Sequence, residues 1–178
     1  MMNLNRPFIL LKWAQTNDGY IARSNYDSRW ISNSNSRQLV HKWRSEEDAI
    51  LIGYNTAKYD NPSLNVRNWA GSDPVKVILD PRNELDDELN IFNGLGKTVI
   101  LNTLTDEVKG DVIKIRLESK GFISNAMDYL YSESIGSVLV EGGAKTLTEL
   151  IALGLWDEAK IFNSEKKFEE GIKAPSIK

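Results

Sequence analysis

The run Val138–Gly143 contains residues whose types and order can bind an anion. A buried strand that passes through a Glu-Gly-Gly turn into a helix lets backbone N–H groups approach a phosphate, and the helix N-terminus adds partial positive charge. Lys145, Thr146 and Thr148 are further donors in that helix. The run has neither the GxGxxG nor the Walker pattern. Because paired glycines also permit close packing of strand on helix, the turn predicts either a phosphate site or a tight packing point.

Several charged side chains also need partners. Lys12 lies inside an apolar strand, so it must form an ion pair with a carboxylate such as Glu141 or contact a ligand. Arg44 and Arg67 can converge on a phosphate, which arginine binds through two parallel hydrogen bonds. The alternative is that Arg44 neutralises the C-terminus of its own helix and that Arg67 is a surface residue. Ser28 is a further donor for an anion.

Tryptophan, histidine and cysteine, the other residue types that could stack on a ligand, catalyse or bind a metal, offer few candidates. Trp30 lies in a polar run and can stack on a planar ligand. His41 is the only histidine, and we expect it to be structural or solvent-facing rather than catalytic. The chain has no cysteine, which excludes disulfides, thiol nucleophiles and Cys/His zinc sites, so we expect no metal.

Composition limits the class of protein further. The chain has 178 residues, of which 41% are hydrophobic, which fits one domain with a sizeable core. A net charge of −3 does not suggest a nucleic acid or a membrane surface as partner. The first seven residues lack the features of a signal peptide, and no apolar run approaches the roughly 18 residues of a membrane span. We therefore expect a cytoplasmic globular protein.

Short apolar runs alternate with helical patterns along the chain. We expect helices at residues 33–47, 124–132 and 144–153, the last ending at Gly154. We expect strands at residues 8–13, 20–22, 49–53, 75–79, 98–101, 112–117, 137–140 and 159–162. This order predicts an α/β fold whose central, mostly parallel mixed sheet has helices on both faces. The strand at 112–117 alternates apolar and charged residues, as an edge strand or a half-exposed strand does. The turn at 17–19 and the last strand suggest some antiparallel pairing.

Polar residues and glycines follow several of these strands. They are Ala14-Gln15, Gly53, Asp80 and the turn at 141–143. Ligands of open parallel sheets bind at the carboxyl ends of the strands. We therefore expect these positions to line one crevice.

The ordered set of motifs resembles the reductase domain of the bifunctional riboflavin-biosynthesis deaminase–reductase, a relative of dihydrofolate reductase. The resemblance extends over residues 6–175, which we take as one domain. The matching segments are Arg6–Gly19, Ser28–Ser32, His41–Arg44, Asp48–Arg67, Val75–Asp80, Val138–Lys145 and Leu155–Glu158. It implies a dihydrofolate-reductase-like fold, NADPH as cofactor and, since relatives are usually dimers, a homodimer.

The resemblance also implies site residues. Those at positions that contact NADP in the family are Ala14, Trp30, Thr56, Asp60, Gly143, Ala144, Lys145, Thr146, Leu147, Thr148 and Glu149. Those at substrate-contacting positions are Ser28, Arg44, Leu64, Arg67 and Glu141. The family's substrate is 5-amino-6-(5-phosphoribosylamino)uracil, whose ribosyl group is reduced to the ribityl form. In this reaction Glu141 can accept hydrogen bonds from the pyrimidine edge, and Lys12 can polarise the sugar carbonyl or supply the proton.

Some features depart from the family pattern. Pro81 stands where the family often has a small hydroxyl residue, which puts one cofactor contact in question. The zinc deaminase domain is missing, so the chain is either a single-function protein or part of a longer one, and it ends sooner than relatives do. Two alternatives stay open: a dihydrofolate or pteridine reductase, for which no suitable protonating carboxylate is evident, and a non-catalytic nucleotide-binding domain of the same fold.

Overall fold

The structure is a computed structural model that describes residues 5–28, 34–94 and 96–177. Trp30, one of the predicted cofactor contacts, lies outside these ranges. The strands are β1 (Phe8–Gln15), β2 (Tyr20–Ala22), β3 (Ala49–Gly53), β4 (Val75–Leu79), β5 (Thr98–Asn102), β6 (Glu107–Lys109), β7 (Val112–Arg116), β8 (Ser137–Val140), β9 (Glu158–Asn163) and β10 (Ile172–Lys173). The helices are α1 (Ser34–Glu46), α2 (Tyr54–Asp60), α3 (Phe122–Ser132) and α4 (Ala144–Ala152).

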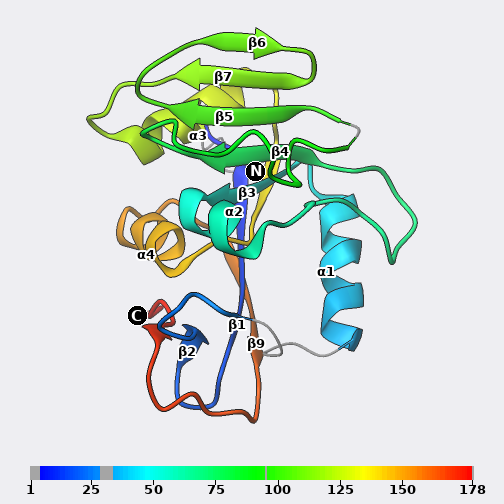
Figure 1. Ribbon diagram of the computed structural model, residues 1–178, viewed down its shortest axis with the longest axis vertical. Coiled ribbons are helices and arrows are strands. Elements are labelled where there is room, and N and C mark those ends of the chain that lie inside the picture. Colours follow the sequence, from blue (N-terminus) through cyan, green and yellow to red (C-terminus); the bar gives the residue numbers. More distant parts are fainter. Residues whose placement is uncertain (1–4, 29–33, 95, 178) are drawn as a thin grey trace.

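Within these ranges, eight strands form the main sheet in the order β6-β7-β5-β4-β3-β8-β1-β9. The strands pair in parallel except for β6 with β7. Figure 1 shows β5 and β7 running in a different direction from β1 and β9, so the sheet is strongly twisted. Every residue of β3 and β5 is buried, as expected for parallel strands covered on both faces. The predicted mostly parallel sheet is confirmed.

The helices cover both faces, as predicted. In the first core, α3 and α4 pack on side chains such as Leu11, Leu51 and Val140. The opposite face carries Ile52, which packs on α2, and Phe162 of β9, whose ring stacks on a tryptophan of α1 at 5.5 Å between centroids. Side chains alternate between the two faces along a strand. In β1, β3 and β8, the residues that alternate in sequence with those of the first core therefore point to the face of α1 and α2.

The outer strands differ in part from the prediction. The strand predicted at 112–117 is β7, which is half-buried, one of the two predicted alternatives; it lies second from the edge because the short β6 pairs antiparallel with it. β6 is three exposed residues long, too short for a periodic signal. The last predicted strand, β9, pairs in parallel with β1. The antiparallel partner of β2 is instead β10, a two-residue strand near the C-terminus that sequence patterns did not indicate.

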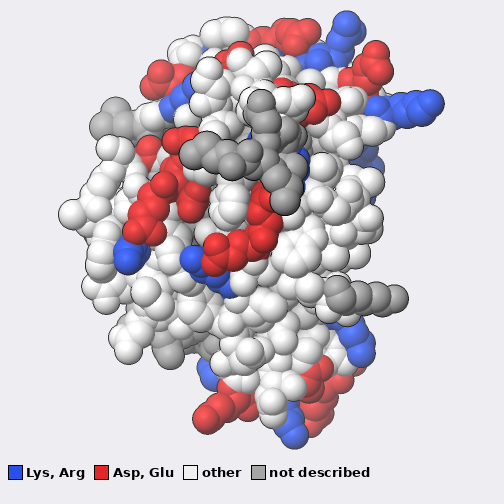
Figure 2. All heavy atoms as spheres, turned by 180° about the vertical axis from the view of Figure 1, so that it is seen from behind, with Lys and Arg blue, Asp and Glu red and all other residues white. Residues whose placement is uncertain are grey.

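The predicted helices are present with small shifts at their ends. At the end of α4, Gly154 has φ +66 and its N–H donates to the Ile151 carbonyl at 3.1 Å, so it terminates the helix as predicted. The sequence gives no indication of α2, because this helix has only seven residues and starts directly after β3, without a linker. No helix in the described ranges is long and apolar enough to cross a membrane. On the face seen in Figure 2, acidic and basic side chains lie beside one another.

Candidate active site

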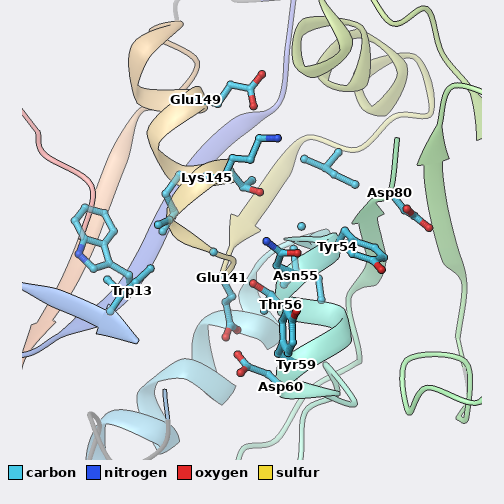
Figure 3. Close-up of a pocket in the computed structure, with 18 of the residues that line it drawn as sticks. Trp13, Tyr54, Asn55, Thr56, Tyr59, Asp60, Asp80, Glu141, Lys145 and Glu149 are labelled. Atoms are coloured by element: carbon cyan, nitrogen blue, oxygen red, sulfur yellow. The ribbon is translucent and has the colours of Figure 1, made fainter. Parts of the chain in front are cut away.

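A cleft of about 1120 Å³ opens at the carboxyl ends of β1, β3, β4 and β8, between the first turns of α2 and α4 (Figure 3). The predicted crevice is confirmed, since Ala14, Gly53, Asp80, Glu141 and Gly143 line it, whereas Gln15 and Gly142 do not. The other predicted site residues that line it are Lys12, Ser28, Arg44, Thr56, Asp60, Leu64, Ala144, Lys145, Thr146, Leu147 and Glu149.

Two predicted site residues lie outside the lining. Thr148 is exposed in the second turn of α4, where its backbone N–H belongs to the regular helix. Arg67 is exposed, and its backbone N–H donates to Nδ1 of His41 at 3.3 Å. In this structure neither side chain forms part of the cleft wall, so a ligand contact from either stays a prediction.

The glycine pair is a tight packing point, one of the two alternatives that the sequence left open, while a phosphate site here stays a prediction. A Cβ on Gly142 would lie 2.7 Å from Cα of Ile52, so this glycine permits β8 to end tightly against β3. Gly143 has φ +63, a left-handed conformation that favours glycine, and it is the N-cap residue of α4. A third glycine, Gly53, lies at the start of α2, and a Cβ added to it would lie 2.5 Å from Oγ1 of Thr146. These close approaches hold the two helix starts together at the cleft.

The start of α4 is suited to an anion. It has no side-chain cap, and the first N–H groups of a helix have no partner within it. Lys145 and Thr146 belong to this first turn, and Figure 3 shows Lys145 across the cleft from Thr56 of α2. Free backbone donors, a helix dipole and a lysine together fit a phosphate group such as that of a dinucleotide.

Glu141 is the charged centre of the cleft. Its backbone N–H donates to the Leu51 carbonyl at 3.0 Å, which holds it in line with β8. Its carboxylate receives two hydrogen bonds from Arg44, from Nε at 2.6 Å and from Nη2 at 3.0 Å. Nζ of Lys12 lies 3.6 Å from Oε2. The predicted ion pair between Lys12 and Glu141 is therefore present, and the buried Arg44 completes a triad.

This triad governs the ionisation of Glu141. Burial opposes the charged carboxylate, but the charges of Lys12 and Arg44 and their hydrogen bonds outweigh it and hold the pKa of Glu141 below its ordinary value of 4.5. The carboxylate is therefore ionised at neutral pH. Its side chain is only 9% exposed, and that remaining exposure faces the cleft. A carboxylate has about four acceptor positions, so at least one stays open to donors of a ligand.

The lowered pKa predicts a pH dependence of stability. A carboxyl whose folded pKa is depressed contributes stability that is complete above its unfolded pKa and is lost as pH falls through the folded value. Urea unfolding of the wild type should therefore show a loss of stability below about pH 4.5. The difference in free energy of unfolding between wild type and Glu141→Gln should shrink over the same range. A difference that stays constant from pH 7 to pH 3 would contradict the charge assignment.

The structure adds two partners of Arg44 that the sequence did not indicate. Besides Glu141, it binds the Asn65 carbonyl through Nη1 at 3.0 Å, so three of its five donors are used within the protein. Arg44 lies in the last turn of α1, as the helix-end alternative expects, and it also lines the cleft, so a contact from it to a phosphate stays a prediction. Ser28 donates through Oγ to Asp60 at 3.4 Å, which brings a predicted substrate contact beside a predicted cofactor contact.

Aromatic residues complete the wall of the cleft, and the sequence did not indicate them. The rings of Tyr26 and Tyr59 stack at 4.2 Å between centroids, joining the loop after β2 to α2. Tyr54 of α2 also lines the cleft (Figure 3). Recognising α2 from the sequence would have placed Tyr54 and Tyr59 there. Pro81 lies in the lining beside Thr103, whose Oγ1 donates to the Pro81 carbonyl at 2.8 Å.

Comparison with solved structures defines the class of protein first. The chain resembles dihydrofolate reductase from Enterococcus faecalis complexed with NADP(H), with a TM-score of 0.54 and 15% identity over 96% of this chain and 78% of that chain. It is much more similar to a diaminohydroxyphosphoribosylaminopyrimidine deaminase/5-amino-6-(5-phosphoribosylamino)uracil reductase from Thermotoga maritima. That match has a TM-score of 0.85 and 35% identity over 94% of this chain and 47% of that chain. The fold is therefore dihydrofolate-reductase-like, as predicted.

Sequence comparison then identifies the family. The riboflavin biosynthesis protein RibD of Aquifex aeolicus is 36% identical over 173 residues, which are 94% of this chain and 49% of that protein. The model of the RibD C-terminal domain matches residues 7–164. The chain belongs to the RibD C-terminal domain family, which confirms the resemblance seen in the motifs. It spans about half the length of the curated relatives it matches.

Proposed function

We propose that the chain is an NADPH-dependent reductase that converts the ribosyl group of 5-amino-6-(5-phosphoribosylamino)uracil to the ribityl form. The observation that carries the proposal is the ionised Glu141, held by Lys12 and Arg44 directly beside the glycine-lined start of α4. A polar ring can bind at the first feature and a dinucleotide phosphate at the second. Membership of the RibD C-terminal domain family supports the same assignment.

The cofactor side is the wall formed by α2 and α4. The uncapped N-terminus of α4 and Lys145 would hold a phosphate of NADPH, and Ala14, Thr56 and Gly143 line the same cleft. When bound there, NADPH supplies a hydride. The chain's own task is to exclude water and to hold the acceptor carbon close to the donor.

The substrate side is the triad. The Glu141 carboxylate accepts hydrogen bonds from N–H groups of the pyrimidine, while Arg44 keeps it oriented. As hydride adds to C1′ of the sugar, the bond from C1′ to the ring oxygen breaks, and that oxygen takes up a proton. Lys12 lies beside Glu141 in the cleft and is the group that we assign to polarise the sugar or to supply this proton.

One observation argues against a dihydrofolate or pteridine reductase. Such an enzyme needs a carboxyl group that can carry a proton towards the pterin ring. Glu141 is paired with two cations, which hold its pKa below the ordinary value and keep it ionised. We therefore propose the ribosylamino-uracil phosphate rather than a pterin as substrate.

The test is to follow reduced nicotinamide absorbance in mixtures of protein, NADPH and one candidate substrate. We expect oxidation with 5-amino-6-(5-phosphoribosylamino)uracil and none with dihydrofolate or without substrate. Oxidation with dihydrofolate alone would overturn the proposal. Tight binding of NADPH with no oxidation by either substrate would instead favour a non-catalytic nucleotide-binding domain.

We also propose a homodimer. β9 is an edge strand of six residues in the described sheet, and Ile161 on it is 39% exposed. A long edge strand with an apolar side chain is a surface that a second copy can cover. Sedimentation equilibrium should give twice the mass of one chain, and a single-chain mass at micromolar concentration would exclude the dimer.

A further inference from the structure

We propose that His41 is a positioning residue, which holds the loop 61–67 against α1 and so keeps the substrate side of the cleft in shape. The inference rests on the proposed function, since this loop borders the half of the cleft assigned to the substrate. His41 is 5% exposed on the buried face of α1. Its Nδ1 accepts a hydrogen bond from the backbone N–H of Arg67 at 3.3 Å.

A second bond from α1 reaches the same loop. One helical turn after His41, Arg44 donates through Nη1 to the Asn65 carbonyl at 3.0 Å while it binds Glu141 with its other donors. α1 therefore contacts the loop backbone at two points, residues 65 and 67. Because Arg44 connects one of these points to the Glu141 carboxylate, a shift of the loop would disturb the group that we assign to the pyrimidine.

The loop needs this support because its local conformation is unfavourable. Leu64 has φ +54, in the left-handed region that side chains rarely adopt, and it is 2% exposed while lining the cleft. In the described part of the chain, Oδ1 of Asn65 is buried without a hydrogen-bond partner. Leu64 is anchored in the second core, and the ends of the loop are held by bonds from Val66 to Asp73 and from Asn90 to Asn61. The bonds from His41 and Arg44 are the ones that fasten the loop backbone to α1.

The role requires a neutral imidazole, because Nδ1 accepts a proton only when it carries none. Burial and the nearby charges of Arg44 and Arg67 lower the pKa of His41 below its ordinary value of 6.5, whereas Glu141 and the Asn65 carbonyl act in the opposite direction. The ring is therefore neutral at pH 7. Protonation in acid would make Nδ1 a donor, so that it and the Arg67 N–H would be two donors facing each other, and the hydrogen bond would break.

Two variants distinguish the loss of the hydrogen-bond acceptor Nδ1 from the loss of the imidazole ring. His41→Asn keeps a side-chain oxygen near the position of Nδ1, whereas His41→Leu keeps an apolar side chain and removes the acceptor. We expect amide exchange of Arg67, measured by NMR on the chain without ligands, to become at least about tenfold faster in His41→Leu and to stay within about twofold in His41→Asn. In turnover, His41→Leu should raise KM for the uracil substrate about tenfold and leave kcat and NADPH affinity unchanged.

A wild-type measurement covers the case in which His41→Leu does not fold. The protection factor of the Arg67 amide should fall as the pH is lowered below 6.5 in the wild type and stay level in His41→Asn. The inference is overturned if Arg67 exchange in His41→Leu equals that of the wild type, if His41→Asn exchanges as fast as His41→Leu, or if protection shows no pH dependence. Because exchange needs no ligand, it decides the role of His41 even if no substrate is turned over and the proposed function fails.

Discussion

Glu141→Gln should lower kcat/KM for the ribosylamino-uracil phosphate about 100-fold, which corresponds to about 2.7 kcal/mol of transition-state stabilisation. The amide keeps the shape of the side chain but removes the negative charge between Lys12 and Arg44. The half-buried Lys12 and the buried Arg44 then lack their shared counter-ion, and truncating one partner of a buried charge pair commonly costs about 2–5 kcal/mol. Steady-state kinetics with NADPH saturating measures the effect.

A matched control is Glu133→Gln. This glutamate also pairs with a lysine, Lys97, at 3.3 Å, but its side chain is 41% exposed and lies outside the cleft. Exposed ion pairs contribute little, so kcat/KM should stay within about twofold of the wild type. A Glu141→Gln enzyme that retains more than about half of wild-type kcat/KM would remove the triad from the mechanism.

Gly142→Ala should lower the free energy of unfolding by about 3 kcal/mol, the upper end of the range for inserting a methyl group into a packed site. The added Cβ would lie 2.7 Å from Cα and 2.9 Å from Cβ of Ile52. The nearest of these atoms is backbone, so β8 and β3 must move apart. Urea denaturation measures the loss, and NADPH titration of the folded variant should show weaker binding because α4 begins two residues later.

Gly136→Ala is the corresponding control at the other end of β8. Its added Cβ would meet only Oδ2 of Asp48, at 3.2 Å, where the surroundings are exposed. We expect its free energy of unfolding to change by less than about 1 kcal/mol. Equal urea midpoints for Gly142→Ala and the wild type would show that the close approach of β8 to β3 does not require a glycine at position 142.

The parts of the fold that the sequence predicted are those with strong local signals. The fully buried β3 and β5, each built on a continuous apolar run, are examples, and their burial on both faces makes a parallel sheet the natural arrangement. The missed elements are short. β6 and β10 have three and two residues, and tertiary pairing rather than local propensity defines them.

The site was predictable where a residue's own chemistry demanded a partner. Lys12 in an apolar strand pointed to a carboxylate, and Glu141 is that carboxylate. The bond between Arg44 and Glu141 was not predictable from spacing, because these residues are 97 positions apart and meet only through the strand order. The same holds for the stack of Tyr26 on Tyr59, since one belongs to a loop and the other to the unrecognised α2.

The most direct test follows the hydride itself. The protein is incubated with 5-amino-6-(5-phosphoribosylamino)uracil and NADPH deuterated at C4 of the nicotinamide, on one face and then on the other, and the product is analysed by mass spectrometry and NMR. One of the two labelled cofactors should deliver a single deuterium to C1′ of a ribityl product. A product without deuterium from either cofactor, or with deuterium in the pyrimidine ring, would contradict reduction of the ribosyl group in this cleft.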